Sequence, residues 1–141
     1  MIRPAVCADA PGIYTLICAL EETRFPQEIF AWGLDTMLGS PSHILLVAEE
    51  QGNIVGLLHM RMEFQLHHCG KVAEILELIV SQEVRSKGIG AALLKAARAQ
   101  AVQQHCIQFE VTSNRKREKA HCFYRREGLE QTHVNLTQAL L

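Results

Sequence analysis

The stretch "VAEILELIVSQEVRSKGIGAALLKAARAQ", residues 72–100, decides the fold. Residues 72–80 are almost continuously apolar, which is typical of a central strand with both faces covered. From Gly88 to Gln104 the apolar residues recur at helical spacing, and "IQFEVT" at 107–112 is a further strand. A strand, a helix and a strand in this order predict a right-handed parallel crossover over residues 72–112.

Working outward from this unit, "HILLVAEE" at 43–50 and "IVGLLHMRMEF" at 54–64 flank the turn "QGN" and predict an antiparallel hairpin. Capping residues, helical spacing and strand-like runs predict three more helices and two terminal strands. These elements cover residues 1–6, 10–20, 27–38, 114–126 and 129–141. The resulting order, β-α-α-β-β-β-α-β-α-β, predicts an α/β protein with a mixed sheet and helices on its faces.

The composition suits one compact domain, and we expect residues 1–141 to form it. Apolar residues make up 48% of the chain, and the net charge of −1 gives no general attraction to nucleic acid or to an acidic membrane. No run is long enough to span a bilayer, and the N-terminus lacks a signal-peptide pattern, so a cytoplasmic location is expected. The five cysteines contain no C-x-x-C pair and are predicted to be reduced thiols.

Glycine and positive charge gather where the helix of the crossover begins. Gly88 and Gly90 allow the backbone to approach a ligand closely, and a helix N-terminus presents free N–H groups with a partial positive charge. Arg85 and Lys87 add attraction for an anion. The pattern therefore favours a phosphate or pyrophosphate cradle, although a glycine-rich connection with solvated charges has the same composition.

Two motifs in this part of the chain resemble the signatures of the GNAT family of N-acetyltransferases. The first is R-x-x-G-x-G, the family's acyl-CoA motif, at Arg85, Gly88 and Gly90. The second is an Asn, then A-x-x-F-Y, then Gly and an apolar residue, found here at Asn114, Ala120, Phe123, Tyr124, Gly128 and Leu129. The segments "LHMRMEFQLHH", "EILELIV" and "AHCFYRREGL" are similar to the bacterial aminoalkylphosphonate N-acetyltransferases of that family.

This resemblance implies a GNAT fold: a mixed, mostly antiparallel twisted sheet with a central splayed parallel strand pair. It implies transfer of an acetyl group from acetyl-CoA to a primary amine. The main chain near Leu78 to Val80 would bind the pantetheine, and Asn114 would bind the cofactor or only cap a helix. Arg85 would touch phosphate or lie in solvent. Pyrophosphate N–H groups would come from Lys87, Gly88, Ile89, Gly90 and Ala91, and the three main-chain pantetheine residues are Leu78, Ile79 and Val80.

Acetyl transfer to an ammonium needs a base for the amine and benefits from an acid for the thiolate. Glu74 and Glu77 are carboxylates inside an apolar strand, where burial is costly without a role or a partner. Being three apart, they face opposite sides unless a bulge re-aims one of them. We expect Glu74 to be the base, with Glu77 as the alternate. The structural alternative for each is an edge-facing or salt-bridged glutamate. Tyr124 is expected to be the acid, or else a core tyrosine.

Histidines gather near the predicted substrate end. His59 and Arg61 share one strand face, and His67 and His68 lie in the following loop, where an extended backbone would point them apart. Arg61, His59 and His67 are expected to bind the phosphonate of an aminoalkylphosphonate. A divalent metal held by His59 with His67 or His68 would bridge to the same group. Surface or packing histidines are the alternative.

Several functions stay open on the sequence alone. The leading one is an acetyl-CoA-dependent enzyme for a small-molecule amine. The sign of the charge near Arg61 and His59 distinguishes an anionic phosphonate substrate from a polycationic aminoglycoside. An aminoglycoside, a polyamine or a protein amine would use the same chemistry, and a non-catalytic acyl-CoA-binding sensor is the alternative outside catalysis. An edge strand or the C-terminal strand could pair two copies into a homodimer.

Overall fold

A computed structural model describes residues 1–85 and 87–141 of the chain. Five strands form one sheet in the order β1-β2-β3-β4-β5. The strands are β1 Ile2–Pro4, β2 His43–Glu50, β3 Asn53–Gln65, β4 Gly70–Val80 and β5 Gln108–Val111, and the α-helices are α1 Ala10–Glu21, α2 Gln27–Leu38, α3 Ile89–Gln103 and α4 Glu118–Arg126.

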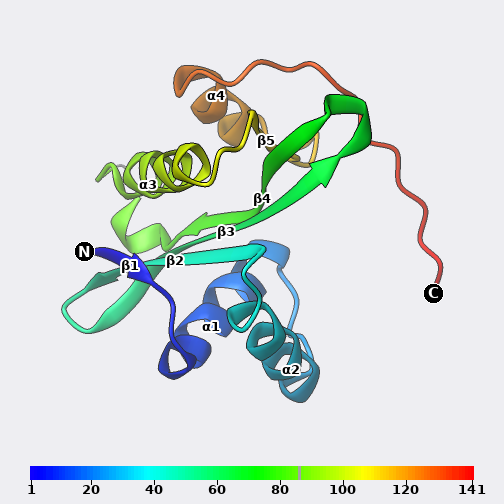
Figure 1. Cartoon of the computed structure of the whole chain (residues 1–141). Helices are drawn as coiled ribbons and strands as arrows, with labels where there is room; N and C mark the ends of the chain where they lie inside the picture. Colours follow the sequence, from blue (N-terminus) through cyan, green and yellow to red (C-terminus); the bar gives the residue numbers. More distant parts are fainter. Residues whose placement is uncertain (86) are drawn as a thin grey trace.

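The helices cover both faces of the sheet, with α1 and α2 on one side and α3 and α4 on the other (Figure 1). Each side has its own apolar core. Leu58, Met60 and Ile75 point toward Leu93 of α3, whereas Leu57 points toward the core of α1 and α2. Strands β1 to β4 pair antiparallel and β4 pairs with β5 in parallel, so the predicted mixed α/β fold is confirmed. None of the described helices has the length and apolar character needed to cross a membrane.

Strands β4 and β5 separate partway along β4. Their pairing ends with Ile75 opposite Val111, while β4 continues to Val80. On its other side, β4 stays paired with β3 as far as Val80, opposite Gly56. The last five residues of β4 therefore have a free backbone edge on the β5 side, which is the splayed strand pair that the sequence led us to expect.

A bulge interrupts β4 just where the separation begins. His59 of β3 lies opposite Glu77, but its neighbour Met60 lies opposite Ile75, so Leu76 has no partner on β3. An extra residue in a strand reverses the faces of everything beyond it. Glu74 and Glu77 consequently project from the same face of the sheet.

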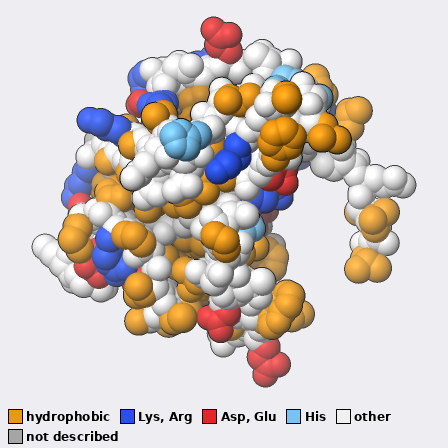
Figure 2. Space-filling model, in the orientation of Figure 1, with side chains coloured by type: hydrophobic (Ala, Val, Ile, Leu, Met, Phe, Trp, Pro, Cys, Tyr) orange, Lys and Arg blue, Asp and Glu red, His pale blue; other side chains and the backbone are white. Residues whose placement is uncertain are grey.

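The predicted C-terminal strand is wrong. After α4 the chain has no regular secondary structure from residue 127 to 141 beyond a turn. Val134, Leu136 and Leu140 are more than four-fifths exposed. Figure 2 shows hydrophobic side chains on this extended segment, which leaves the body of the molecule. The alternating apolar pattern of this segment pairs with none of the five described strands.

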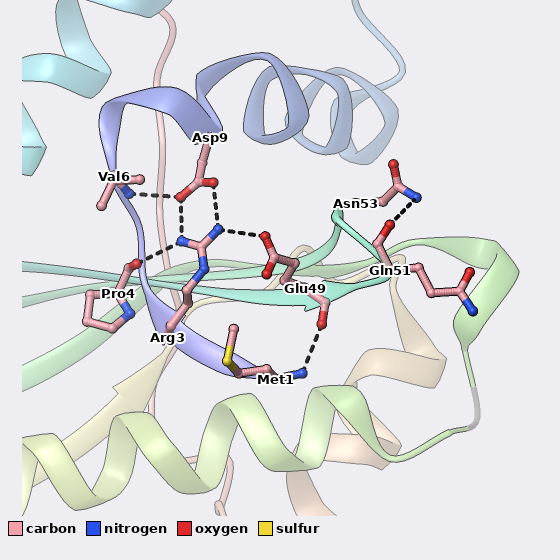
Figure 3. Close-up of polar contacts among 8 residues, drawn as sticks. All are labelled: Met1, Arg3, Pro4, Val6, Asp9, Glu49, Gln51 and Asn53. Atoms are coloured by element: carbon pink, nitrogen blue, oxygen red, sulfur yellow. Dashed lines mark hydrogen bonds and ion pairs between the residues drawn. The ribbon is translucent and has the colours of Figure 1, made fainter.

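An ion-pair network anchors the N-terminal strand to the sheet (Figure 3). Both Nη atoms of Arg3 donate to the Asp9 carboxylate at 2.8 Å, and Nη2 also donates to Glu49 at 3.0 Å. The Val6 N–H donates to Asp9 at 2.8 Å. The hydrogen bonds from Arg3 lower the pKa of Asp9 below its usual value despite its burial.

We expect Asp9→Asn to lower the free energy of unfolding at neutral pH by roughly 1.5–3 kcal/mol, because hydrogen bonds to a charged group contribute about that much. The folded-state pKa of Asp9 is depressed, so its stabilisation is present above the unfolded pKa and is lost as the pH falls through the folded value. Urea unfolding at several pH values should therefore show the two proteins converging in acid. A constant difference across the acid range, or an equal loss in the exposed control Glu130→Gln, would contradict this account.

Candidate functional site

The start of α3 presents an unoccupied row of backbone donors. Its first helical hydrogen bond runs from the Ala92 N–H to the Gly88 carbonyl at 3.0 Å, so the N–H groups of Ile89, Gly90 and Ala91 have no acceptor in the helix. Gly88 holds the cap in the left-handed region at φ 79°, and no side chain of the described residues caps this end. Exposed Lys87 lies next to the cap. This arrangement suits an anion such as a pyrophosphate.

The free edge of β4 adds a second set of backbone groups. The Ser81 N–H donates to the Val55 carbonyl of β3. Backbone groups alternate along a strand, so the N–H and C=O of Leu78 and Val80 face the open β5 side while those of Ile79 face β3. Arg85 is exposed and its Nε donates to the Val80 carbonyl at 3.2 Å, so its side chain lies against the end of this edge.

Residues 113 and 114 follow the end of β5, where its pairing with β4 stops. The Asn114 side-chain oxygen accepts a hydrogen bond from the Lys116 N–H at 2.9 Å, in a turn that precedes α4. Asn114 thus shapes the approach to the helix, although Arg117, and not Asn114, is its N-cap residue. The neighbouring Ser113 hydroxyl is buried with no hydrogen-bond partner among the described residues.

Tyr124 of α4 lies in the core beneath α3. Its side chain is 7% exposed, and its ring contacts that of Phe123 edge-on at 5.3 Å. Burial raises the pKa of the Tyr124 hydroxyl above its usual value, with a smaller opposing effect of Arg117. No hydrogen bond to this hydroxyl occurs within the described residues, so it is a protonated donor without a protein acceptor.

A stripe of ionisable side chains crosses the opposite face of the sheet, on the side of α1 and α2. It runs from His43 on β2 through His59 and Arg61 on β3 to Glu74 and Glu77 on β4. His43 lies opposite Arg61, which lies opposite Glu74, and His59 lies opposite Glu77. The bulge at β4 is what brings both carboxylates into this stripe.

The two carboxylates have different partners. Glu74 accepts from Arg61 at 2.9 Å through one oxygen and from the Thr112 hydroxyl at 3.3 Å through the other. Glu63 lies 3.6 Å from the same guanidinium. Glu77 accepts from His59 at 2.5 Å through Oε2. The Nε of Arg61 is buried without a partner in the described part of the chain and can donate to a bound oxygen.

His67 and His68 do not join His59. They form a short 3₁₀ turn at the tip of the β3–β4 hairpin, where their rings lie 4.3 Å apart, so the expectation that they point apart is wrong. His59 lies six residues before the end of β3, which is roughly 20 Å of strand. Both ring nitrogens of His59 already have protein partners. The three histidines therefore do not fit one shared metal site, and the described residues contain no cluster of three or more metal-binding side chains.

Sequence comparison identifies the family. The chain matches the family model "Acetyltransferase (GNAT) family" over residues 10–129. It is 36% identical over 139 residues to the aminoalkylphosphonate N-acetyltransferase of Salmonella typhimurium (strain LT2), covering 99% of this chain and 90% of the relative.

Solved structures share the fold at lower identity. A transcriptional regulator from Bacillus halodurans C-125 superimposes with a TM-score of 0.92 at 21% identity, covering 99% of both chains. An aminoglycoside N-acetyltransferase in complex with CoA superimposes with a TM-score of 0.88 at 14% identity, covering 99% of this chain and 93% of the other. The cradle, the splayed strands and the family match lead to one conclusion: the chain belongs to the GNAT family and is an acetyl-CoA-dependent N-acetyltransferase.

Proposed function

We propose that the chain acetylates the primary amine of a small molecule, with aminoalkylphosphonates as the first substrates to test. The observation that carries the proposal is the free edge of β4, which runs from the backbone cradle at Gly88 to the stripe of ionisable side chains at Glu77. A thioester held along that edge would end beside the carboxylates. The 36% identity to an aminoalkylphosphonate N-acetyltransferase over nearly the whole chain supports this substrate class.

We propose that acetyl-CoA lies along the groups already described. The N–H groups of Ile89, Gly90 and Ala91, with Lys87 beside them, would hold the pyrophosphate, and Leu78 and Val80 would bind the pantetheine amides. The partnerless Ser113 hydroxyl and the strand edge fit a ligand that supplies both donors and acceptors. Asn114 would support this binding mainly by shaping the turn before α4.

For the chemistry, we propose a carboxylate base and Tyr124 as the acid. The base takes one proton from the ammonium, and the amine nitrogen then attacks the acetyl carbonyl carbon. The carbon–sulfur bond breaks and Tyr124 gives its proton to the thiolate. The second proton lost by the nitrogen then replaces the one that Tyr124 gave, so the net products are the amide, CoA thiol and one proton. Our first expectation was Glu74, but its contacts with Arg61 and Thr112 favour Glu77 as the base.

Thiol release from acetyl-CoA tests the function. The panel contains aminomethyl-, 1-aminoethyl- and 2-aminoethylphosphonate, a polyamine and an aminoglycoside, each with added divalent metal and with chelator. We expect turnover with the phosphonates and not with the polyamine or the aminoglycoside. Turnover with every amine irrespective of its anion would overturn the phosphonate assignment. Turnover with none would direct the search to protein amines. Chelator sensitivity would require metal ligands other than the three histidines considered above.

A cationic amine is the second candidate. The stripe contains two carboxylates, Glu74 and Glu77, and Glu63 lies beside it, against the single guanidinium of Arg61. The pKa of His43 is lowered mainly by burial. A surface with that excess of negative charge favours an ammonium-rich substrate such as an aminoglycoside. A lower KM for the aminoglycoside or polyamine than for any phosphonate in the same assay would favour this candidate.

We expect Gly88→Ala to raise the KM for acetyl-CoA by roughly 5- to 30-fold. An L-residue in the left-handed region costs about 1–2 kcal/mol, so the backbone at residue 88 would relax to another conformation. The binding of acetyl-CoA would then have to restore the cradle, which weakens its affinity. Steady-state kinetics with acetyl-CoA varied would measure it. Gly33→Ala in α2 is the matched control, since its new Cβ meets nothing within 4 Å and its backbone is helical. Equal KM values in both variants would contradict the proposed cradle.

We propose that the exposed C-terminal segment pairs two copies of the chain. Its apolar side chains have no partner in the single chain as described, and the outer edge of β5 pairs with no other strand in the described sheet. We expect light scattering to give the mass of a dimer for the full chain and of a monomer after truncation at residue 129. A monomeric full chain at tens of micromolar would contradict the proposal.

A further inference from the structure

Three side chains from three adjacent strands form a continuous hydrogen-bonded chain. His59 Nδ1 lies 2.5 Å from Glu77 Oε2, and His59 Nε2 lies 2.8 Å from His43 Nδ1. The two imidazole rings are stacked with their centroids 5.0 Å apart. His59, in the middle, is only 3% exposed, so both of its nitrogens depend on these partners.

These hydrogen bonds determine which nitrogen of each imidazole ring carries the proton. An ionised carboxylate only accepts hydrogen bonds, so His59 Nδ1 carries the hydrogen that Glu77 accepts. The Nε2 of a neutral His59 is then an acceptor, and His43 Nδ1–H must be its donor. His43 Nε2 is left as the outer end of the chain. His43 lines an open depression of about 200 Å³ together with Leu38 and Gln100, so this end is accessible to water.

The surroundings keep His43 neutral. Burial is the main cause that lowers the pKa of His43, and the charge of Arg61 acts in the same direction against the weaker effect of Glu77. Leu38 of α2 and Gln100 of α3 line the depression, and neither side chain titrates. A neutral His43 can be a hydrogen-bond donor at Nδ1 while its Nε2 accepts from solvent.

We propose that His43 and His59 are positioning residues that select Glu77 as the base of the acetyl transfer. This inference rests on the proposed function. His59 fixes the Glu77 carboxylate through Oε2 and leaves Oε1, which has no partner among the described residues, to take the ammonium proton. His43 fixes the tautomer of His59. Glu74 lacks this freedom, because both of its oxygens accept hydrogen bonds and a proton on it would disrupt the pair with Arg61.

Four variants test the kinetic part. His43→Phe removes the donor to His59, and we expect kcat to fall roughly tenfold or more, as for partners that orient a functional side chain, with the KM for acetyl-CoA unchanged. His43→Asn places an amide N–H near the position of Nδ1 and should recover most of the loss. His59→Phe should cost more than His43→Phe. His105→Asn, an exposed histidine in the left-handed region, is the control that should behave as the wild type.

Wild-type kcat in His43→Phe, or equal losses in His43→Phe and His43→Asn, would overturn the proposal. The second measurement does not need turnover. Two-bond ¹H–¹⁵N spectra of protein with ¹⁵N-labelled histidine should show both His43 and His59 as neutral Nδ1–H tautomers. An Nε2–H tautomer at either residue would contradict the proposed hydrogen bonds between His43, His59 and Glu77, whether or not the amine panel gives activity. Absent turnover in the wild type with both Nδ1–H tautomers present would instead count against the proposed function.

Discussion

Replacing Glu77 with Gln is expected to lower kcat by roughly 10²- to 10⁴-fold, the usual contribution of a positioned base. The amide keeps the shape of the side chain, and its oxygen can still accept from His59 Nδ1. What it loses is an oxygen that can take the ammonium proton. The KM for acetyl-CoA should change little, because Glu77 lies on the α1 and α2 face and its side chain is not part of the proposed backbone cradle.

Glu74→Gln is the matched comparison for this result. It too keeps its shape, but it leaves the Arg61 guanidinium without its nearest carboxylate. We expect a smaller loss in kcat, an altered KM for the amine and a lower unfolding temperature. Single-turnover acetyl transfer in both variants separates chemistry from product release. If the single-turnover rate falls more in Glu74→Gln than in Glu77→Gln, then Glu74 is the base. The proposal that His43 and His59 select Glu77 would then be wrong.

The sequence predicts the strand and helix around Gly88 well because their signals are local. An apolar strand, two glycines and a helical apolar stripe lie within 30 consecutive residues, and each signal depends on near neighbours only. The structure has the strand, the left-handed Gly88 and the helix where these signals indicate. The free edge of β4 follows from the resemblance to a family and not from spacing, since nothing in the residues themselves marks where the pairing with β5 stops.

The stripe of ionisable side chains is harder to predict, because two bulges determine which residues it contains. Glu50 lies opposite Asn53, and a regular hairpin would then put His43 opposite Met60, on the face of α3. The shift between Ala48 and Glu49 moves His43 opposite Arg61 instead. A one-residue slip exchanges the faces of a strand, so His43 could not be joined to the site by counting. The bulge at Leu76 likewise moves Glu77 to the face of Glu74, because Leu76 has no partner on β3.

The second large effect is expected at Tyr124, where Phe should lower kcat by roughly 10²-fold, at the lower end of the range for a positioned acid. The loss is smaller than for the base, because a thiolate with a parent pKa of about 8.5 is a fair leaving group without a proton. Only the hydroxyl is removed from a side chain that is already in the core, so folding should be preserved.

The pH dependence of kcat also tests the role of Tyr124. Burial raises the folded pKa of Tyr124, so the hydroxyl remains protonated through neutral pH and the acid is lost only as the pH rises through that raised value. The wild-type kcat should therefore fall on the alkaline side, and Tyr124→Phe should lack this limb. Tyr14→Phe is the natural control, because Tyr14 is the only other tyrosine and its hydroxyl donates to the Phe25 carbonyl between α1 and α2. An alkaline limb that persists unchanged in Tyr124→Phe would assign the proton to another group and remove Tyr124 from the chemistry, even if the rate falls.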